Sequence, residues 1–347
     1  MNPWVLFTLI ASLGLGTTIT FASSHWLLAW MGLEINTLAI IPLMAQHHHP
    51  RAIEATTKYF LTQAAAAALL LFAATSNAWM LGTWHIQQPS HPLAIAITMI
   101  SLGMKVGLAP THLWLPEVLQ GLDLTTGLVL STWQKLAPMT LIYQIAPNVN
   151  PTLLFLIGTI SAFMGGWGGL NQSQIRKILA YSSIAHMGWM IIVLKYSPKL
   201  MILNLLVYII MTSTAFMTLK VVSTTSINTL ATAWTKAPTI ITIAMLTMLS
   251  LGGLPPLTGF MPKWMILQEL TKQDLAVTAT IMALTALLSL FFYLRLCYSM
   301  TLTSGPNTTN NKTPWRLKTI TTSPLALMAV ASLTMLPITP ATMALLI

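Results

Sequence analysis

Charged residues are scarce in this sequence, and acidic residues are the scarcest. Only 6% of its 347 residues are charged, with six Asp and Glu against sixteen Lys and Arg. A soluble domain has about 25% charged residues. Hydrophobic residues make up 55% of the chain, and its mean hydropathy is +0.74. This composition excludes a water-soluble globular protein and indicates an integral membrane protein.

Cysteine and the usual cofactor motifs are also missing. The single cysteine, Cys297, excludes a disulfide within the chain, an iron–sulfur cluster and a Cys-based zinc site. There is no GxGxxG after a strand, no nucleophile–base arrangement and no carboxylate cluster suited to a metal. Haem would need paired histidines in facing spans, and only His112 and His186 lie deep in hydrophobic segments. We therefore expect no metal and no cofactor on this chain itself.

The net charge of +10 does not indicate nucleic-acid binding. The Lys and Arg residues are scattered, mostly at the ends of hydrophobic segments, and form no dense basic run with interleaved aromatics. We expect no nucleic-acid partner, since basic loops fit membrane orientation better. The first hydrophobic segment begins at Pro3, without a basic region or small-residue cleavage site before it, so we expect no cleaved signal or transit peptide.

Hydrophobic segments of about 20 residues, the length that crosses a membrane, recur along the chain. The eleven that we predict are 3–22, 26–45, 56–80, 92–118, 125–145, 151–170, 175–194, 200–222, 238–268, 275–299 and 324–345. They predict an all-α integral membrane protein whose single membrane domain covers residues 1–347. Two five-helix repeats, about 3–145 and 151–299, are followed by a C-terminal helix over about 324–345.

Loop charges predict how these spans are oriented. An odd number of spans places the two termini on opposite sides of the membrane. The basic loop residues on the N-terminal side are Arg51, Arg176, Lys177, Lys236, Lys312, Arg316 and Lys318. Those on the other side are Lys195, Lys199 and Lys272. Because Lys and Arg are enriched in inner loops, we predict the N-terminus inside and the C-terminus outside.

Two of the spans share an unusual interruption. Gly107 and Pro110 are followed by another proline six residues later, and Gly253 and Pro256 repeat this spacing. A Ser-Leu-Gly sequence precedes both copies, and a lysine lies close to each. Proline-interrupted spans at matching places in two halves are typical of inverted-repeat transporters, in which the broken helices mark the ion path. Two ordinary proline kinks are the alternative, because membrane helices tolerate them.

Four charged residues fall well inside predicted spans: Glu34, Lys105, Lys135 and Lys263. Each charge at the membrane centre costs about 2.5–3.5 kcal/mol even on the lenient insertion scale. We therefore expect these side chains to face the interior of the helix bundle, to pair, or to contact water. By contrast, Glu54 and Lys58 are four residues apart where the third span begins, and predict an exposed pair.

One acid cannot neutralise three lysines, so the buried charges point to proton transfer. Burial disfavours a charged lysine and a nearby carboxylate favours it, which allows such a lysine to take up or release a proton near neutral pH. Chains of ionisable residues in membranes commonly act as proton relays. His112 and His186 would support this one. The alternative is a set of static ion pairs and, for His186, a hydrogen bond to a neighbouring helix.

Several motifs resemble the antiporter-like subunits of respiratory complex I. Residues 175–188, IRKILAYSSIAHMG, resemble the RKxLAYSSI block of that family. Residues 30–36, WMGLEIN, resemble the segment that carries its glutamate, and residues 132–138, TWQKLAP, match as well. The motifs occur in order over essentially the whole chain. The composition, rich in Met and Thr and poor in acids, is typical of a mitochondrially encoded vertebrate chain.

The resemblance implies a proton-translocating subunit of an H⁺-translocating NADH:ubiquinone reductase. Glu34 and Lys105 would form the input pair, Lys135 would carry the proton on, and Lys263 would gate its exit, with His112 and His186 in support. NADH, FMN, Fe–S clusters and ubiquinone would belong to other subunits. The implied partners are other membrane-arm subunits, lipids, protons and water.

The resemblance also implies a location and leaves two other functions to consider. The protein would be a multi-pass protein of the mitochondrial inner membrane, with its N-terminus in the matrix and its C-terminus in the intermembrane space. Bacterial relatives have three more N-terminal helices. A subunit of a multisubunit cation/proton antiporter would have the same relay. An inert structural spacer of the membrane arm is the third hypothesis, and the four intramembrane charges argue against it.

Overall fold

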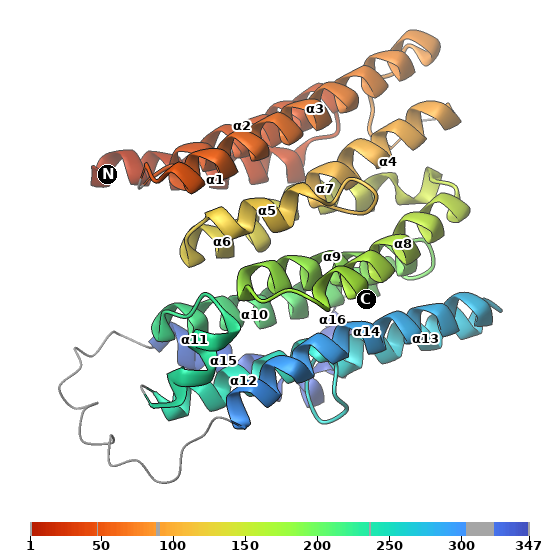
Figure 1. The fold of residues 1–347 in the computed structure, drawn as a ribbon. Helices are drawn as coiled ribbons and strands as arrows, with labels where there is room; N and C mark the ends of the chain where they lie inside the picture. Colours follow the sequence, from red (N-terminus) through yellow and green to blue (C-terminus); the bar gives the residue numbers. More distant parts are fainter. Residues whose placement is uncertain (1, 47, 88–90, 236, 303–322, 346–347) are drawn as a thin grey trace. The chain divides into compact units, whose positions relative to one another are not determined.

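A computed structural model describes residues 2–46, 48–87, 91–235, 237–302 and 323–345. Within these ranges the secondary structure is helical, with two isolated β-bridges and no strand (Figure 1). Four of the basic residues used to predict orientation, Lys236, Lys312, Arg316 and Lys318, lie outside the described ranges. The chain forms two compact units, residues 1–161 and 162–347, and the boundary falls within α8.

The first unit begins with long helices and continues with shorter ones. Its elements are α1 (Pro3–Ala22), α2 (Trp26–Met44), α3 (Pro50–Leu81), α4 (Pro92–Val106), α5 (Trp114–Gly121), α6 (Leu124–Ser131), α7 (Trp133–Ile145), η1 (Ala146–Asn148) and the start of α8 (Pro151–Gly169). α3 packs against α2, α4 and α5, and α7 against α1, α2 and α4. α1 approaches α2 closely, since a Cβ added at Gly16 would lie 2.8 Å from the Gly32 carbonyl oxygen.

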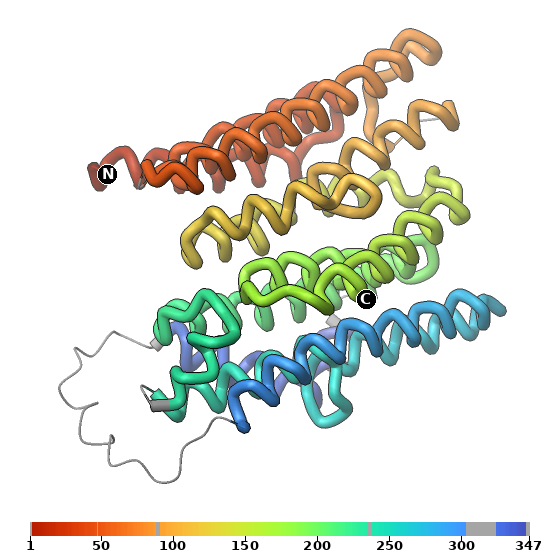
Figure 2. Tube along the Cα trace, viewed as in Figure 1, coloured from red at the N-terminus to blue at the C-terminus, as the bar shows by residue number. Residues whose placement is uncertain are grey.

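The second unit is built around α9. Its further elements are α9 (Ile175–Val193), α10 (Pro198–Val222), α11 (Ile227–Ala231), η2 (Thr232–Thr235), α12 (Pro238–Gly252), α13 (Phe260–Lys272), α14 (Ala276–Thr301), α15 (Ser323–Thr334), η5 (Leu336–Ile338) and α16 (Thr339–Leu345) (Figure 2). α9 is buried along nearly its whole length, and it contacts α10, α13 and α14. A helix that is buried on all sides forms the core of its unit.

Proline and glycine set many of the helix ends. α1, α3, α4, α8, α10 and α12 all begin at a proline. Proline suits this position because its missing N–H would have no partner in the first turn. α3, α4 and α12 are each followed by a capping glycine, Gly82, Gly107 and Gly253, in the left-handed conformation that glycine adopts without a steric penalty.

Two spans predicted as single helices are interrupted. The segment predicted at 125–145 divides at Thr132, whose side chain donates a hydrogen bond of 2.7 Å to the Leu128 carbonyl. Such back-bonding bends helices, and Pro138 removes a further N–H from the next turns. The C-terminal segment predicted at 324–345 bends by 65° between α15 and α16. Pro337, in the 3-10 turn η5 that joins them, explains this bend.

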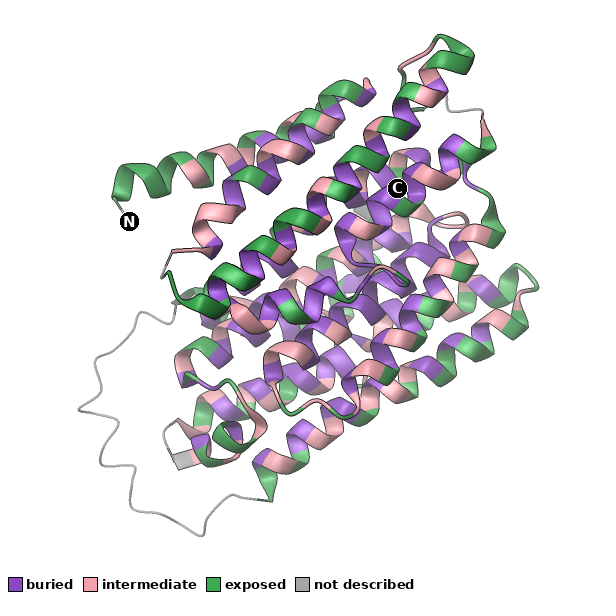
Figure 3. Cartoon of the chain, turned by 45° about the horizontal axis from the view of Figure 1, so that its top comes forward, coloured by how far each residue is buried: buried purple, intermediate pink, exposed green. Residues whose placement is uncertain are grey.

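Six described helices are long and apolar enough to cross a membrane, or seven if the bent α15–α16 pair is one span. Figure 3 shows the exposed residues on the outward faces of the long helices and the buried residues on the faces between them. In α1 the exposed side chains include Trp4, Phe7 and Ile10, which are typical of a lipid-facing surface. The described chain is therefore an all-helical membrane protein.

Candidate functional site

The first broken helix lies in the first unit, where α4 ends at Val106 and α5 begins at Trp114. Gly107 has φ 87°, and the bond from Ala109 to Pro110 is cis. The Leu108 N–H and the Gly107 N–H both donate to the Gly103 carbonyl, at 2.8 and 2.9 Å. This cap stops α4 and leaves Lys105 in its last turn. The negative end of the helix dipole favours a cation at that place.

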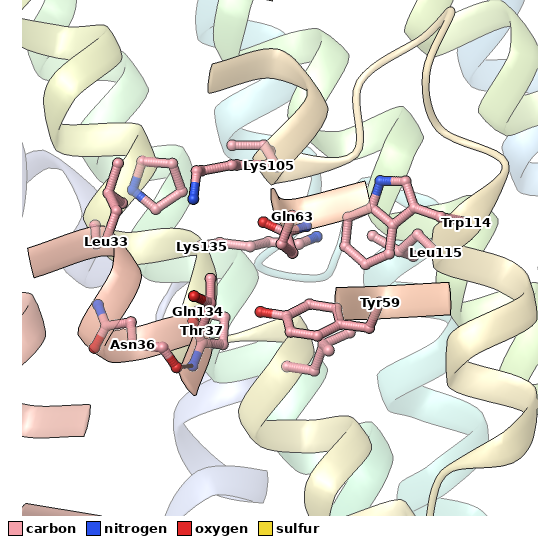
Figure 4. Close-up of a pocket in the computed structure, with 14 residues that line it drawn as sticks. Leu33, Asn36, Thr37, Tyr59, Gln63, Lys105, Trp114, Leu115, Gln134 and Lys135 are labelled. Atoms are coloured by element: carbon pink, nitrogen blue, oxygen red, sulfur yellow. Dashed lines mark hydrogen bonds between the residues drawn. The ribbon is translucent and has the colours of Figure 1, made fainter. Parts of the chain in front are cut away.

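Lys105 lines a small cavity in the first unit (Figure 4). The cavity has a volume of about 20 Å³. About 10–15 Å³ of such space holds one water molecule, if polar partners line it. The polar residues of the lining are Asn36, Thr37, Tyr59, Gln63, Lys105, Gln134 and Lys135. The cavity therefore has both the volume and the partners for a buried water.

Lys135 enters the same cavity from the first turn of α7 and is only 4% exposed. In Figure 4 its side chain lies between Lys105 and Tyr59. The neighbouring Gln134 donates from Nε2 to the Asn36 carbonyl at 3.2 Å, which ties α7 to α2. Two of the predicted lysines thus come from different helices to one polar space.

Glu34 and Lys105 do not form a direct ion pair within 4.0 Å in the described structure. Glu34 is half-buried on α2. The Glu34 Oε2 and Lys105 Nζ atoms are buried, and neither has a hydrogen-bond partner among the described residues. Both atoms need a partner, because a buried polar atom without one is costly.

His112 follows the first break and is 3% exposed. Its Nδ1 lies 3.2 Å from the Pro110 carbonyl oxygen. A carbonyl oxygen only accepts, so Nδ1 carries the proton and Nε2 remains for another partner. His112 does not belong to the lining of the cavity that Lys105 and Lys135 share.

The second broken helix lies in the second unit, between α12 and α13. Gly253 has φ 84°, and Pro256 lies in the turns that follow. Lys263 is in the first turn of α13 and reaches back to the end of α12. Its Nζ donates to the Gly252 carbonyl at 2.9 Å and to the Leu251 carbonyl at 3.4 Å. An added Cβ on Gly253 would lie 3.0 Å from this Nζ, so the glycine also makes room for the lysine.

His186 lies on α9 and is 6% exposed. Its ring centre is 5.6 Å from that of Tyr208 on α10. Tyr208 lies beside Ser183 of α9, whereas the Tyr293 hydroxyl is buried and has no hydrogen-bond partner among the described residues. The predicted histidine therefore belongs to a buried group of hydroxyl-bearing side chains.

Sequence reasoning missed the neutral polar residues of both places. In the first unit these are Asn36, Tyr59, Gln63 and Gln134, and in the second Ser182, Ser183, Tyr208 and Tyr293. In the sequence these residues stand out only as neutral polar side chains inside predicted spans, and this is a weaker indication of function than a charged side chain there. Sequence reasoning also missed Glu117, which lies 2.7 Å from Lys58, as does the predicted partner Glu54. Over the described ranges, no three His, Cys, Asp or Glu side chains gather as metal ligands would.

Comparisons with known proteins identify the family. Residues 23–289 match the family "NADH:quinone oxidoreductase/Mrp antiporter, TM", and residues 290–343 match "NADH dehydrogenase subunit 2 C-terminus". NADH-ubiquinone oxidoreductase chain 2 of Formosania lacustris is 69% identical over 346 residues, which are 99% of each chain. The Salmo salar protein of that name is 66% identical and covers 100% of this chain and 99% of its own.

Solved structures show the same fold. A chain of respiratory complex I from Thermus thermophilus, with bound aureothin, has a TM-score of 0.87 and 27% identity. The match covers 99% of this chain and 80% of that one. A chain of the Mrp complex from Dietzia has a TM-score of 0.82, covers 97% of this chain and 76% of its own, and at 15% identity shows the fold alone. The resemblance to antiporter-like subunits of complex I is confirmed, and the chain belongs to the NADH-ubiquinone oxidoreductase chain 2 family.

Proposed function

We propose that this chain translocates protons in the membrane arm of respiratory complex I. Lys105 and Lys135, both buried, line one polar cavity that has room for a water, and this observation carries the proposal. NADH:ubiquinone electron transfer takes place elsewhere in the complex. NADH, FMN, the Fe–S clusters and ubiquinone bind to other subunits, and this chain works with its membrane-arm neighbours, lipid, protons and water.

The proton enters at Glu34 and Lys105. Both side chains have a buried polar atom without a partner in the described ranges, and a water between them would satisfy both atoms. While the carboxylate is ionised nearby, it favours the charged form of the lysine. When this influence is withdrawn, burial favours the neutral amine, and the proton leaves through the water in the cavity toward Lys135.

The proton leaves the chain by way of Lys263. The carbonyls of Leu251 and Gly252 hold its ammonium group at the end of α12. His112 and His186 support transfer, the first through its Nε2, since Nδ1 contacts the Pro110 carbonyl, and the second within the hydroxyl cluster around Tyr208. The two helices are broken next to these lysines, at Gly107 and Pro110 and at Gly253 and Pro256. The first break leaves Lys105 beside the cavity, and the second gives Lys263 its carbonyl partners.

Transport outward against a membrane potential requires about 2.3 kcal/mol per 100 mV for each proton. Nothing in this chain releases such energy, so quinone reduction in the complex must supply it. The chain's contribution is a set of groups whose preference for the proton changes when their surroundings change.

The architecture that serves this function has eleven spans. These are the six long apolar helices, α9, and four spans that each consist of two shorter helices: α4 with α5, α6 with α7, α12 with α13, and α15 with α16. Residues 3–145 and 151–299 form the two repeats, and 324–345 the last span. The protein lies in the mitochondrial inner membrane, with its N-terminus in the matrix and its C-terminus in the intermembrane space.

Lys135→Met in the assembled complex tests the proposal. The substitution replaces a buried amine by an apolar chain of similar length that fits the same space, and blue-native electrophoresis checks that the complex assembles. We expect proton pumping by proteoliposomes and the coupled NADH:quinone activity to fall together. Lys58→Met is the control, since Lys58 is exposed and exposed ion pairs contribute little. Normal pumping by assembled Lys135→Met would contradict the relay.

Blue-native electrophoresis separates this function from that of a multisubunit cation/proton antiporter. A complex I subunit migrates with NADH dehydrogenase activity, whereas an antiporter subunit would not. The third hypothesis, an inert spacer, predicts that Lys135→Met and Lys58→Met behave alike.

A further inference from the structure

A second, larger cavity lies in the second unit. It has a volume of about 290 Å³ and is partly open to the surface. α10 forms one wall, and the bent segment from Met335 to Thr342 forms the other. The cavity exists because the chain turns by 65° after α15, which packs against α10, so that α16 continues in a new direction.

The wall on α10 is an apolar stripe. It consists of Leu203, Leu206, Val207 and Ile210. Their spacing of three, four and seven residues places them on one face of the helix. The polar part of the lining is almost nil, so a water there would lack the two to four polar partners that it needs. An engineered apolar cavity of about 150 Å³ stays dry and binds benzene, and this cavity has roughly twice that volume.

A lysine continues the same stripe toward the end of α10. Lys199 is four residues before Leu203, in the first turn of the helix, and its side chain is partly exposed. Within the described ranges it forms no ion pair. α10 has 25 residues and is about 37 Å long, which exceeds the hydrocarbon thickness of about 30 Å. Lys199 thus lies at the membrane surface, with the cavity directly below it at the depth of acyl chains.

We infer that this face binds a phospholipid, with one acyl chain in the cavity and the phosphate at Lys199. The apolar lining suits a hydrocarbon chain, and the volume is too small for a whole lipid, which leaves the head group outside. The positive charge one turn above the cavity complements the phosphate. The exposed Leu206 marks where the chain enters from the bilayer. None of the residues assigned to proton transfer lines this cavity.

The unmodified complex gives the first test. Native mass spectrometry should detect a phospholipid that survives detergent washing. A density map should show its acyl chain between α10 and the α15–α16 bend, with the phosphate beside Lys199. An empty cavity, or one filled by a side chain of another subunit, would overturn the inference.

Variants of the complex give the second test. Leu206→Trp should fill the cavity and abolish retention of that lipid. Lys199→Gln should speed its exchange for a labelled phosphatidylglycerol about fivefold, the effect of one lysine near a membrane surface. The control Lys272→Gln, whose lysine lies 3.8 Å from Glu269, should leave exchange unchanged. Equal exchange in Lys199→Gln and Lys272→Gln would refute the head-group contact, even if Leu206→Trp did not assemble.

Discussion

The two broken helices are capped in the same way but place their lysines differently. α4 and α12 each have 15 residues, begin at a proline and end at a left-handed glycine. Lys105 precedes the first break, and its Nζ has no hydrogen-bond partner among the described residues. Lys263 follows the second break, and two carbonyls accept from its Nζ. The break in the first unit thus leaves its lysine amine at a polar cavity, whereas the break in the second unit has its lysine amine bound to backbone carbonyls.

Corresponding positions of the two breaks are separated by a constant number of residues. Gly107 and Gly253 are 146 residues apart, as are Pro110 and Pro256. Glu117 stands at this same separation before Lys263. Glu117 contacts Lys58 at the surface, whereas Lys263 is buried. The shared Gly and Pro spacing of the two breaks therefore does not bring the same chemistry, because single positions beside them carry opposite charges.

The largest difference that we expect is between Lys263→Met and Lys105→Met. Lys263→Met leaves the Leu251 and Gly252 carbonyls without their donor, which should destabilise the chain by about 1–3 kcal/mol. Lys105→Met removes a buried amine that has no hydrogen-bond partner in the described part of the chain, and it should be neutral or stabilising. Thermal unfolding of the purified complexes, followed by scanning fluorimetry, measures both. Equal melting temperatures of the two variants would contradict the claim that the contacts of Lys263 stabilise the chain and those of Lys105 do not.

Gly253→Ala tests how closely the second break fits its lysine. An alanine at φ 84° is strained by about 1–2 kcal/mol, and its Cβ would also press on Lys263. Gly82→Ala is the matched control, because Gly82 has φ 71° with open space around it. We expect both variants to lose stability but only Gly253→Ala to lose pumping, as measured in proteoliposomes. Loss of pumping in both would mean that the strain, and not the position of Lys263, matters.

Tyr59→Phe should affect the first unit more mildly. It removes one hydroxyl from the cavity and leaves the ring against Trp114, 5.7 Å away between centres. We expect pumping to slow about fivefold, which corresponds to one hydrogen bond of about 1 kcal/mol. Tyr143→Phe, on the exposed side of α7, provides the control and should pump normally. A Tyr59→Phe variant as active as this control would show that the cavity water needs no tyrosine.

Glu117→Gln should have the smallest effect. The residue is exposed, and Lys58 keeps Glu54 as a partner at 2.7 Å. A surface ion pair contributes about 0–1 kcal/mol, so stability should change by no more than that. Pumping should also stay normal, although Glu117 and Lys263 have equivalent places beside the two breaks. A pumping defect would place Glu117 on the proton path.

Much of the fold was predictable because prolines and glycines determine helix ends locally. Pro3, Pro92 and Pro238 start helices where the sequence predicted them, and the membrane composition requires helices throughout. The division at Thr132 was not predictable. A threonine donates to a preceding carbonyl in many unbroken helices, and Pro138 is tolerated within α7. The bend at Pro337 was not predicted either, because a proline within a membrane span does not always bend it.

The charged residues of the candidate site could be found from sequence because a charge inside a membrane is anomalous by itself. Asn36 and Gln63 could not, since a neutral amide in a span has many ordinary explanations. The distance of Glu34 from Lys105 could not be predicted either. It depends on the packing of α2, α3 and α4, and sequence patterns do not fix this packing to within the length of a water molecule.

The most direct measurement is a density map of the complex at a resolution that shows ordered water. We expect one water in the cavity of the first unit, within hydrogen-bond reach of both Lys105 and Lys135. A second water should lie between Glu34 and Lys105. A dry cavity, with Lys105 bonded directly to a protein group and no water to connect it with Lys135, would contradict the proposed relay.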